Sequence, residues 1–322
     1  MKKIRTGVIG TGRMGEYHTA IYSELFIVDL VGIVDIKEER GKTISKQFNT
    51  AYFYDFHEIL DKVDAVSIAV PTGLHYTIAK EFLSAGVNVL LEKPITNNFN
   101  QAVELFELAK KNNCTLHIGH VERFNGAVQE LKKIVHEPLL IESRRLGPFQ
   151  TRIEDDGVVM DLMIHDIDII LNLVESEILD INVMGRSYFT GKDDLASVQI
   201  QFKNNCIANI IASRATQDKI RTMAISQKDA YIYLDFTDQE IHIHRGASSE
   251  HRLEKHELHY KQESFTERLF VHRENPLKLE IKHFLNCSAN GAASSISVDK
   301  ELRSLKVALE IGDKFKKSQT NL

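Results

Sequence analysis

The stretch Ile4-Arg5-Thr6-Gly7-Val8-Ile9-Gly10-Thr11-Gly12-Arg13-Met14-Gly15 decides the fold of the first part of the chain. An apolar, strand-like run leads directly into Gly10-x-Gly12-x-x-Gly15, and a helix-patterned segment follows. Glycines at this spacing allow a tight turn, close approach of the backbone to a pyrophosphate, and close packing of helix on strand. An ordinary strand-to-helix turn is the alternative explanation. We expect a dinucleotide-binding loop at residues 10–15, with Thr11, Arg13 and Met14 among its contacts.

The first 120 residues alternate between strand-like and helix-like patterns. The strand-like runs are Ile4–Ile9, Val28–Val34, Ala65–Val70, Val87–Leu91 and Thr115–Gly119. Helix-patterned stretches lie between them, at Tyr17–Leu25, Lys37–Phe48, His75–Ala85 and Gln101–Asn112. This alternation is typical of an α/β fold with a doubly wound parallel sheet, so we expect a Rossmann domain over residues 1–122.

The pattern changes after residue 122. Strand-like runs separated by short turns follow a long helix-patterned segment, Val158–Val174; they are Ile178–Arg186, Ala196–Phe202, Cys206–Arg214, Thr222–Ser226, Tyr231–Phe236 and Glu240–Arg245. Two helices, Pro276–Asn290 and Asp299–Lys314, come last. Short turns favour hairpins. We therefore expect residues 123–322 to form an α+β domain with a large, mostly antiparallel open sheet.

Composition narrows the functional class. The chain has 322 residues, 43% of them hydrophobic, and a net charge of -5. This charge gives no electrostatic reason to expect nucleic acid or an anionic membrane as partner. The strand that begins at Ile4 leaves no room for a signal peptide, and the three cysteines fit neither a disulfide framework nor a zinc site. We expect a cytoplasmic protein with reduced thiols and no bound metal.

The end of the second strand indicates the cofactor. Asp35 stands where a carboxylate can accept hydrogen bonds from both ribose hydroxyls and repel a 2′-phosphate. Ile36 follows where NADP-dependent enzymes often have Arg or Ser. These residues favour NAD. The basic residues Lys37 and Arg40 could bind a 2′-phosphate, so NADP is the alternative cofactor.

A second strand-to-helix turn, Pro71-Thr72-Gly73-Leu74-His75, follows the run that ends at Val70. One interpretation is a simple helix start with Thr72 as its cap. The other is a cofactor contact through Pro71, Thr72 and His75. The two interpretations are compatible.

Glu92-Lys93-Pro94 follows the next strand, at the sheet edge where ligands bind in such folds. Alcohol oxidation needs a base for the hydroxyl proton and a group that stabilises alkoxide charge. Lys93 suits either role, Glu92 could hold it, and Pro94 would stiffen the backbone. A solvated loop lysine is the alternative.

Three polar residues recur within an apolar helix pattern. Asp161, His165 and Asp168 are spaced i, i+4 and i+7, which places them on one helix face. Three interpretations stay open: a histidine base oriented by a carboxylate, a metal site, or a solvated face. Upstream, Arg144, Arg145 and Arg152 could bind phosphate or carboxylate, or could be surface charges.

Several motifs together resemble the Gfo/Idh/MocA oxidoreductase family. They are Gly10–Gly15, Glu92-Lys93-Pro94, Gly119-His120-x-x-Arg123-Phe124-Asn125 and Asp161-x-x-x-His165, and the resemblance spans nearly the whole chain. It implies catalytic roles for Lys93, Asp161 and His165, contact of Glu92 and Lys93 with nicotinamide, and an oligomer formed through the second domain.

Within the family, the segments 120–125 and 161–169 look most like the members that oxidise C3 of UDP-N-acetylglucosamine. This resemblance implies a nucleotide-sugar substrate met by Arg123, Asn125, Arg144, Arg145 and Arg152 together with Asp161 and His165. Such members are similar to enzymes that feed an aminotransferase in lipid A synthesis. Alternatives are a dehydrogenase of a free sugar or inositol, and a non-catalytic dinucleotide-sensing regulator.

Overall fold

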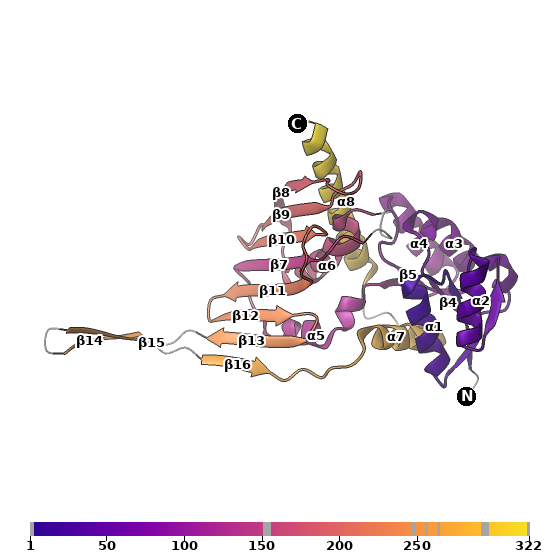
Figure 1. Ribbon diagram of the computed structural model, residues 1–322, viewed down its shortest axis with the longest axis horizontal. Coiled ribbons are helices and arrows are strands. Elements are labelled where there is room, and N and C mark those ends of the chain that lie inside the picture. The colour runs from indigo at the N-terminus through magenta and orange to yellow at the C-terminus, as the bar shows by residue number, and fades with distance from the viewer. Residues whose placement is uncertain are drawn as a thin grey trace. The chain divides into compact units, whose positions relative to one another are not determined.

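The computed structural model describes residues 3–150, 156–245, 249–254, 257–262, 265–290 and 296–320. The chain divides into two compact units. Unit 1 comprises Met1–Phe124 and Asn275–Leu309, and unit 2 comprises Asn125–Glu274 and Glu310–Leu322. Each unit has its own sheet, and Figure 1 labels many of the helices and strands of both.

Unit 1 is built on a six-stranded sheet with the order β3-β2-β1-β4-β5-β6, and every pairing in it is parallel. The strands are β1 (Ile4–Ile9), β2 (Val28–Val34), β3 (Ala51–Phe53), β4 (Ala65–Ile68), β5 (Asn88–Glu92) and β6 (Leu116–Gly119). The connecting helices are α1 (Arg13–Glu24), α2 (Glu38–Gln47), α3 (Thr72–Ser84) and α4 (Phe99–Lys111), with short 3-10 turns η1 (Phe56–Ile59) and η2 (Val121–Phe124). The expected doubly wound sheet is confirmed. The edge strand β3 was not expected from the sequence, because its three residues are too short to form a pattern.

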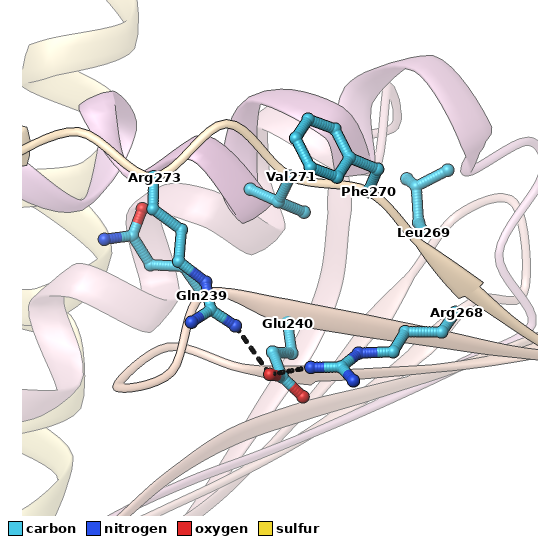
Figure 2. A pocket seen from close by; sticks show the side chains of 7 residues that line it. All are labelled: Gln239, Glu240, Arg268, Leu269, Phe270, Val271 and Arg273. Atoms are coloured by element: carbon cyan, nitrogen blue, oxygen red, sulfur yellow. Dashed lines mark hydrogen bonds and ion pairs between the residues drawn. The ribbon is translucent and has the colours of Figure 1, made fainter.

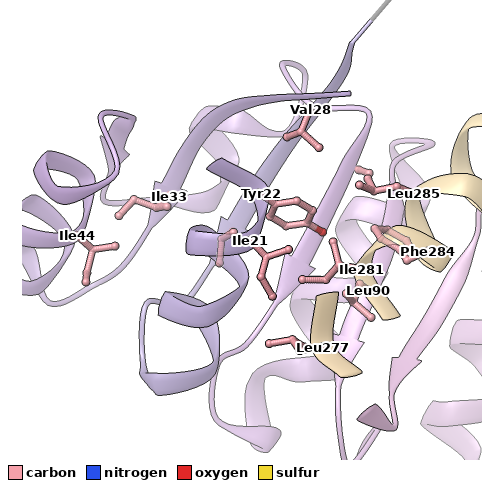
Figure 3. Close-up of a cluster of buried hydrophobic side chains, with 12 residues drawn as sticks. Ile21, Tyr22, Val28, Ile33, Ile44, Leu90, Leu277, Ile281, Phe284 and Leu285 are labelled. Carbon is pink, nitrogen blue, oxygen red and sulfur yellow. The ribbon is translucent and has the colours of Figure 1, made fainter. Parts of the chain in front are cut away.

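A helix from the far end of the chain completes the core of unit 1. Leu277, Ile281, Phe284 and Leu285 of α7 (Pro276–Asn290) pack with residues of α1, β1, β2 and β5 in one buried cluster (Figure 3). The expected boundary after residue 122 lies close to the observed one after Phe124, but the expectation that residues 123–322 form one domain needs correction, because Asn275–Leu309 belong to unit 1. A contact between segments so far apart in the chain leaves no local pattern, so the sequence placed α7 in the second domain.

Unit 2 contains an eight-stranded sheet with the order β16-β13-β12-β11-β7-β10-β9-β8. The strands are β7 (Leu140–Leu146), β8 (Ile178–Arg186), β9 (Leu195–Phe202), β10 (Ile207–Ser213), β11 (Ile220–Gln227), β12 (Ala230–Asp235), β13 (Glu240–Arg245) and β16 (Phe265–Leu269). Only the β7–β10 pairing in this sheet is parallel, which confirms the mostly antiparallel sheet. Strands β14 (Ser249–Glu254) and β15 (Glu257–Gln262) pair with each other as a separate hairpin, and the sequence patterns predicted neither them nor β16.

Helices cover one face of this sheet. The π-helical turn η3 (Val159–Met163) continues into α6 (Ile164–Leu173), and buried Ile164, Ile167 and Ile170 are part of the core there. The remaining helices are α5 (Gly126–Ile134) and α8 (Val298–Thr320), whose end contacts β8 through a bond from Lys314 Nζ to the Ile181 carbonyl. Residues on β7 alternate between buried and exposed, so only one face of the sheet is covered.

Candidate functional site

The glycine loop of unit 1 has the geometry that a bound pyrophosphate requires. Gly10 has φ +84°, and a Cβ on it would lie 2.7 Å from the Ala69 carbonyl oxygen. A Cβ on Gly15 would lie 1.8 Å from the Gly10 carbonyl oxygen, so helix and loop pack without room for a side chain. A Cβ on Gly12 would meet nothing within 4 Å, which leaves the backbone open beside the N-terminus of α1. These residues fit a dinucleotide phosphate.

The other loop residues have separate tasks. Arg13 is exposed and its Nε donates to the Tyr17 hydroxyl at 3.0 Å, while the Met14 side chain packs against the core of unit 1. The Thr11 amide and hydroxyl both donate to Oδ2 of Asp35, at 2.8 and 2.6 Å.

Asp35 is buried and surrounded by donors. Its Oδ1 accepts from the Lys37 amide at 2.8 Å, and the Arg40 guanidinium pairs with Oδ2 at 2.6 Å. Burial alone would raise the pKa of Asp35, but the hydrogen bonds from Thr11, Lys37 and Arg40 hold it below the usual value. Ile36 is exposed beside it. The carboxylate is thus ionised and fixed at the end of β2, as a ribose-binding acid must be.

The turn after β4 differs from the expected capping arrangement. Pro71 occupies the N-cap position of α3 and Thr72 is the first helical residue, so Thr72 is not the cap. His75 is buried, with Nδ1 2.8 Å from the Pro94 carbonyl oxygen and Nε2 2.9 Å from the Val70 carbonyl oxygen. Burial, the largest influence, lowers the pKa of His75. Both ring nitrogens thus join two loops of the sheet edge, and a direct cofactor contact by them is not supported.

Glu92 and Lys93 end β5 at the same edge. Lys93 is half-buried and its peptide bond to Pro94 is cis. Glu92 is buried and its Oε1 lies 3.0 Å from Nε2 of His18 on α1. Burial would raise the pKa of Glu92, but the hydrogen bond and charge of His18 lower it. Glu92 thus bonds His18, and the charge of Lys93 beside it also lowers its pKa.

Arg123 and Asn125, which the resemblance assigned to substrate, have structural partners. The Arg123 guanidinium is buried and pairs with Glu301 of α8, with Nη2 3.2 Å from Oε2. Asn125 caps α5 by accepting from the Ala127 amide, and its Nδ2 donates to the Phe236 carbonyl. Both side chains hold elements of their own unit, and their assignment to substrate stays a prediction.

Unit 2 carries the proposed acid and histidine on the π-helical turn and the start of α6. Asp161 and His165 are half-buried, whereas Asp168 is fully buried. A π-helical turn within a helix is frequent at functional sites. Asp161 and His165 are the members of the expected polar face that approach the surface, and the sequence pattern did not predict the π geometry.

The three arginines upstream of α6 do not act as one group. Arg145 is buried, and its Nε and Nη2 donate to Asp166 at 3.0 and 2.9 Å. Its guanidinium also lies over the Phe236 ring at 4.9 Å. Arg144 is exposed on the opposite face of β7, and Arg152 lies outside the described residues. Arg145 thus binds Asp166 through two of its nitrogens, and Arg144 lies on the exposed face of β7; their substrate roles stay predictions.

A cavity of about 570 Å³ lies elsewhere in unit 2, between β13 and the segment after β16. Glu240 there pairs with both Arg268 and Arg273 (Figure 2). The predicted site residues do not line this cavity, and its charges already satisfy one another. In the part of the chain that the structure describes, no helix combines the length and hydrophobicity needed to cross a bilayer.

Comparison with known proteins gives matches across both units. Residues 4–120 match the Gfo/Idh/MocA model described as "Oxidoreductase family, NAD-binding Rossmann fold", and residues 126–233 match the "GFO/IDH/MocA C-terminal domain". UDP-N-acetylglucosamine 3-dehydrogenase of Acidithiobacillus ferrooxidans is 37% identical over 251 residues, which cover 77% of this chain and 80% of that protein.

Two solved structures extend the comparison. A structure of the Acidithiobacillus ferrooxidans enzyme has a TM-score of 0.87 at 32% identity and covers 98% of both chains. The scyllo-inositol dehydrogenase of Lactobacillus casei, solved with NAD(H) and scyllo-inositol, has a TM-score of 0.80 at 19% identity and covers 98% of both chains. At that identity the second likeness shows the fold alone.

Proposed function

The chain belongs to the Gfo/Idh/MocA oxidoreductase family and is an NAD-dependent oxidoreductase of CH–OH groups; from this premise we propose that it oxidises C3 of UDP-N-acetylglucosamine to the 3-keto sugar. The observation that carries the substrate is the 37% identity to an enzyme of that name across 77% of this chain. Similarity of this extent covers both the cofactor unit and the unit that would carry the sugar.

The residues of unit 1 would hold NAD along the carboxyl edge of its sheet. The open backbone at Gly12 and the N-terminus of α1 would face the pyrophosphate, and Asp35 would accept from the ribose hydroxyls. Arg40 now pairs with Oδ2 of Asp35. Its guanidinium would have to move aside for that oxygen to accept from a ribose hydroxyl. When bound, NAD supplies the nicotinamide ring that accepts the hydride. Glu92 and Lys93 would lie beside this ring at the end of β5.

The proton of the sugar hydroxyl requires a base. We assign this role to His165, alkoxide stabilisation to Lys93, and orientation to Asp161. Half-burial of all three side chains supports the assignment, since each is accessible yet partly withdrawn from water. Lys93 and His165 can exchange roles within the same scheme. The regulator alternative would leave this set of ionisable groups without a task.

The diphosphate of the substrate carries negative charge that local donors must meet. Arg145 and Arg123 are committed to Asp166 and Glu301. Of the arginines in the approach to η3, Arg152 is therefore our candidate for the diphosphate contact. Planar bidentate donors suit this task.

A second candidate function is oxidation of a free inositol or sugar. It is favoured by the 26% identity over 229 residues, 66% of this chain and 69% of the relative, to myo-inositol 2-dehydrogenase of Thermotoga maritima. Lower identity over a shorter span makes it the weaker candidate.

We further propose that the enzyme acts in the cytoplasm, in lipid A biosynthesis, without nucleic-acid or membrane partners, as a homodimer or homotetramer. The support for self-association is the uncovered face of the unit 2 sheet, where Tyr231 and Tyr233 are exposed next to one another on β12. A symmetric partner would bury such a face. Light scattering that gives the monomer mass of 36.7 kDa at all concentrations would refute the oligomer.

The experiment that tests the function is a panel of UDP-sugars and free sugars incubated with NAD and followed by absorbance of the reduced cofactor. Reduction with UDP-N-acetylglucosamine and competitive inhibition by UDP support the proposal. Reduction with inositol or glucose, without inhibition by millimolar UDP, would replace the substrate and leave the dehydrogenase class intact.

A further inference from the structure

A chain of hydrogen bonds in unit 1 links α1 to the strand end that carries Lys93. His18 Nε2 lies 3.0 Å from Glu92 Oε1, and His18 Nδ1 lies 2.9 Å from Ser67 Oγ. The Ser67 hydroxyl lies in turn 2.8 Å from the Tyr22 hydroxyl. All four side chains are buried, so bulk water does not compete for these bonds.

Glu92 sets the direction of its bond to His18. Burial opposes ionisation of Glu92, but the His18 hydrogen bond and nearby positive charge keep the pKa of Glu92 below its usual value. An ionised carboxylate only accepts, so His18 donates to it through Nε2–H. Ser67 Oγ joins His18 Nδ1 to the Tyr22 hydroxyl, and the tautomer of His18 sets which of these groups donate.

The neighbouring strand is shaped for the same carboxylate. Gly119 on β6 is directly opposite Glu92 in the sheet. A Cβ on Gly119 would lie 3.1 Å from both Cδ and Oε2 of Glu92, which is tighter than ordinary contact. The glycine thus leaves the space that the carboxylate fills, and His18 supplies the donor that holds it there.

In the described part of the chain, ionisable groups from several elements lie around the Glu92 carboxylate. They are His18 of α1, Lys93 next in the chain, His75 of α3 and Glu280 of α7. Glu280 is fully buried, and burial followed by the charge of Glu92 raises its pKa well above the usual value. The two carboxyl groups thus have opposite environments: ionisation is favoured at Glu92 and disfavoured at Glu280.

We propose that His18 is a positioning residue for the reaction, which acts by holding the Glu92 carboxylate ionised and in place behind Lys93 and the nicotinamide ring. The inference rests on the proposed function, because it takes Lys93 as the group that acts on the hydroxyl. A fixed negative charge at this point holds the Lys93 ammonium in one position. It also favours the cationic, oxidised nicotinamide over the reduced one.

Two variants of His18 separate its two hydrogen bonds. The amide of His18→Gln reaches the position of Nε2 and keeps a donor for Glu92. The shorter amide of His18→Asn reaches only the position of Nδ1 and leaves Glu92 without that donor. We expect His18→Asn to lower kcat about tenfold or more, as loss of a buried charged partner does, with little change in KM for the sugar. His18→Gln should keep most of the wild-type kcat.

The pH profile distinguishes positioning from a structural role. Without its donor, the buried carboxyl of Glu92 has a raised pKa and ionises only as pH rises. The kcat of His18→Asn should therefore recover toward high pH, in a limb that the wild type lacks. Tyr22→Phe alters only the far end of the chain and should retain wild-type kcat and pH profile.

Cofactor binding provides a readout that needs no sugar. His18→Asn should weaken NAD⁺ binding several-fold relative to NADH, measured by fluorescence titration. If the wild type oxidises no UDP-sugar, the substrate assignment fails but this ratio still tests His18.

Should His18→Asn not fold, Glu92→Gln serves instead, with the same losses and no recovery at high pH. Equal loss in His18→Asn and His18→Gln with a wild-type pH profile would overturn the proposal, as would a wild-type NAD⁺ to NADH ratio.

Discussion

Two buried charge pairs, one in each unit, differ in what they hold. The His18–Glu92 pair of unit 1 lies at the end of a strand, next to Lys93. The Arg145–Asp166 pair of unit 2 joins the body of a strand to the helix that covers it. A charge pair at a strand end shapes a ligand edge, whereas a pair between layers fixes the packing of sheet and helix. Burial of charge is therefore not by itself a sign of a substrate site.

The largest expected effect is on catalysis at the strand end of unit 1. Lys93→Met should lower kcat by about 10²–10⁴-fold, because it removes a group that acts on the reacting hydroxyl. The melting temperature and NAD affinity should stay close to wild type. Lys133→Met is the control, since Lys133 is an exposed lysine paired with Glu130 in unit 2. Near-normal turnover of Lys93→Met would assign this lysine a structural role.

The largest expected effect on stability lies in unit 2. Arg145→Met leaves Asp166 buried without its bidentate partner, so it should lower the free energy of unfolding by about 3–5 kcal/mol. Arg144→Met is a matched control on the same strand, and its exposed side chain predicts a change within about 0.5 kcal/mol. Urea denaturation measures both. Equal effects of the two variants would remove the contrast between the two faces of β7.

A smaller change in the free energy of unfolding, of opposite sign, is expected for a substitution at Glu280. Both of its carboxyl oxygens are buried and have no hydrogen-bond partner among the residues described, and His117 Nε2 lies 3.6 Å away. Glu280→Met should therefore raise the free energy of unfolding by about 1–3 kcal/mol, because an unsatisfied buried group is removed.

The pH dependence of this gain has a definite sign. The pKa of Glu280 is raised in the folded state. The folded wild type is therefore most stable at low pH, and it loses stability as the pH rises above the pKa that Glu280 has in the unfolded chain. The advantage of Glu280→Met should grow from about pH 4 upward toward neutrality. Denaturation at several pH values measures it. An advantage that is constant with pH would contradict the proton held on Glu280.

The sequence predicted unit 1 well because its motifs constrain the backbone locally. Gly10 allows the turn, Gly12 leaves the backbone open to a ligand, and Gly15 allows close packing of helix on loop. Strands β1 and β2 have the expected bounds. His18 was missed, although Tyr22 stands four positions later on the same face of α1 and gives a faint signal of a polar pair.

The substrate side was predicted less well, because its arginines pair over long distances in the chain. Arg123 meets Glu301 178 positions away, and Arg145 meets Asp166 21 positions away. A single sequence shows neither pairing. Strand alternation alone could have separated Arg144 from Arg145, since adjacent residues of a strand point to opposite faces.

The measurement that tests the central claim most directly uses UDP-N-acetylglucosamine deuterated at C3. With NAD and the wild-type enzyme, the proposed function predicts that the deuterium appears in the reduced nicotinamide and that the nucleotide sugar becomes the 3-keto product. Mass spectrometry of the reduced cofactor detects the transfer. Formation of undeuterated NADH, or no reduction with this sugar while inositol is oxidised, would contradict oxidation at C3 of UDP-N-acetylglucosamine.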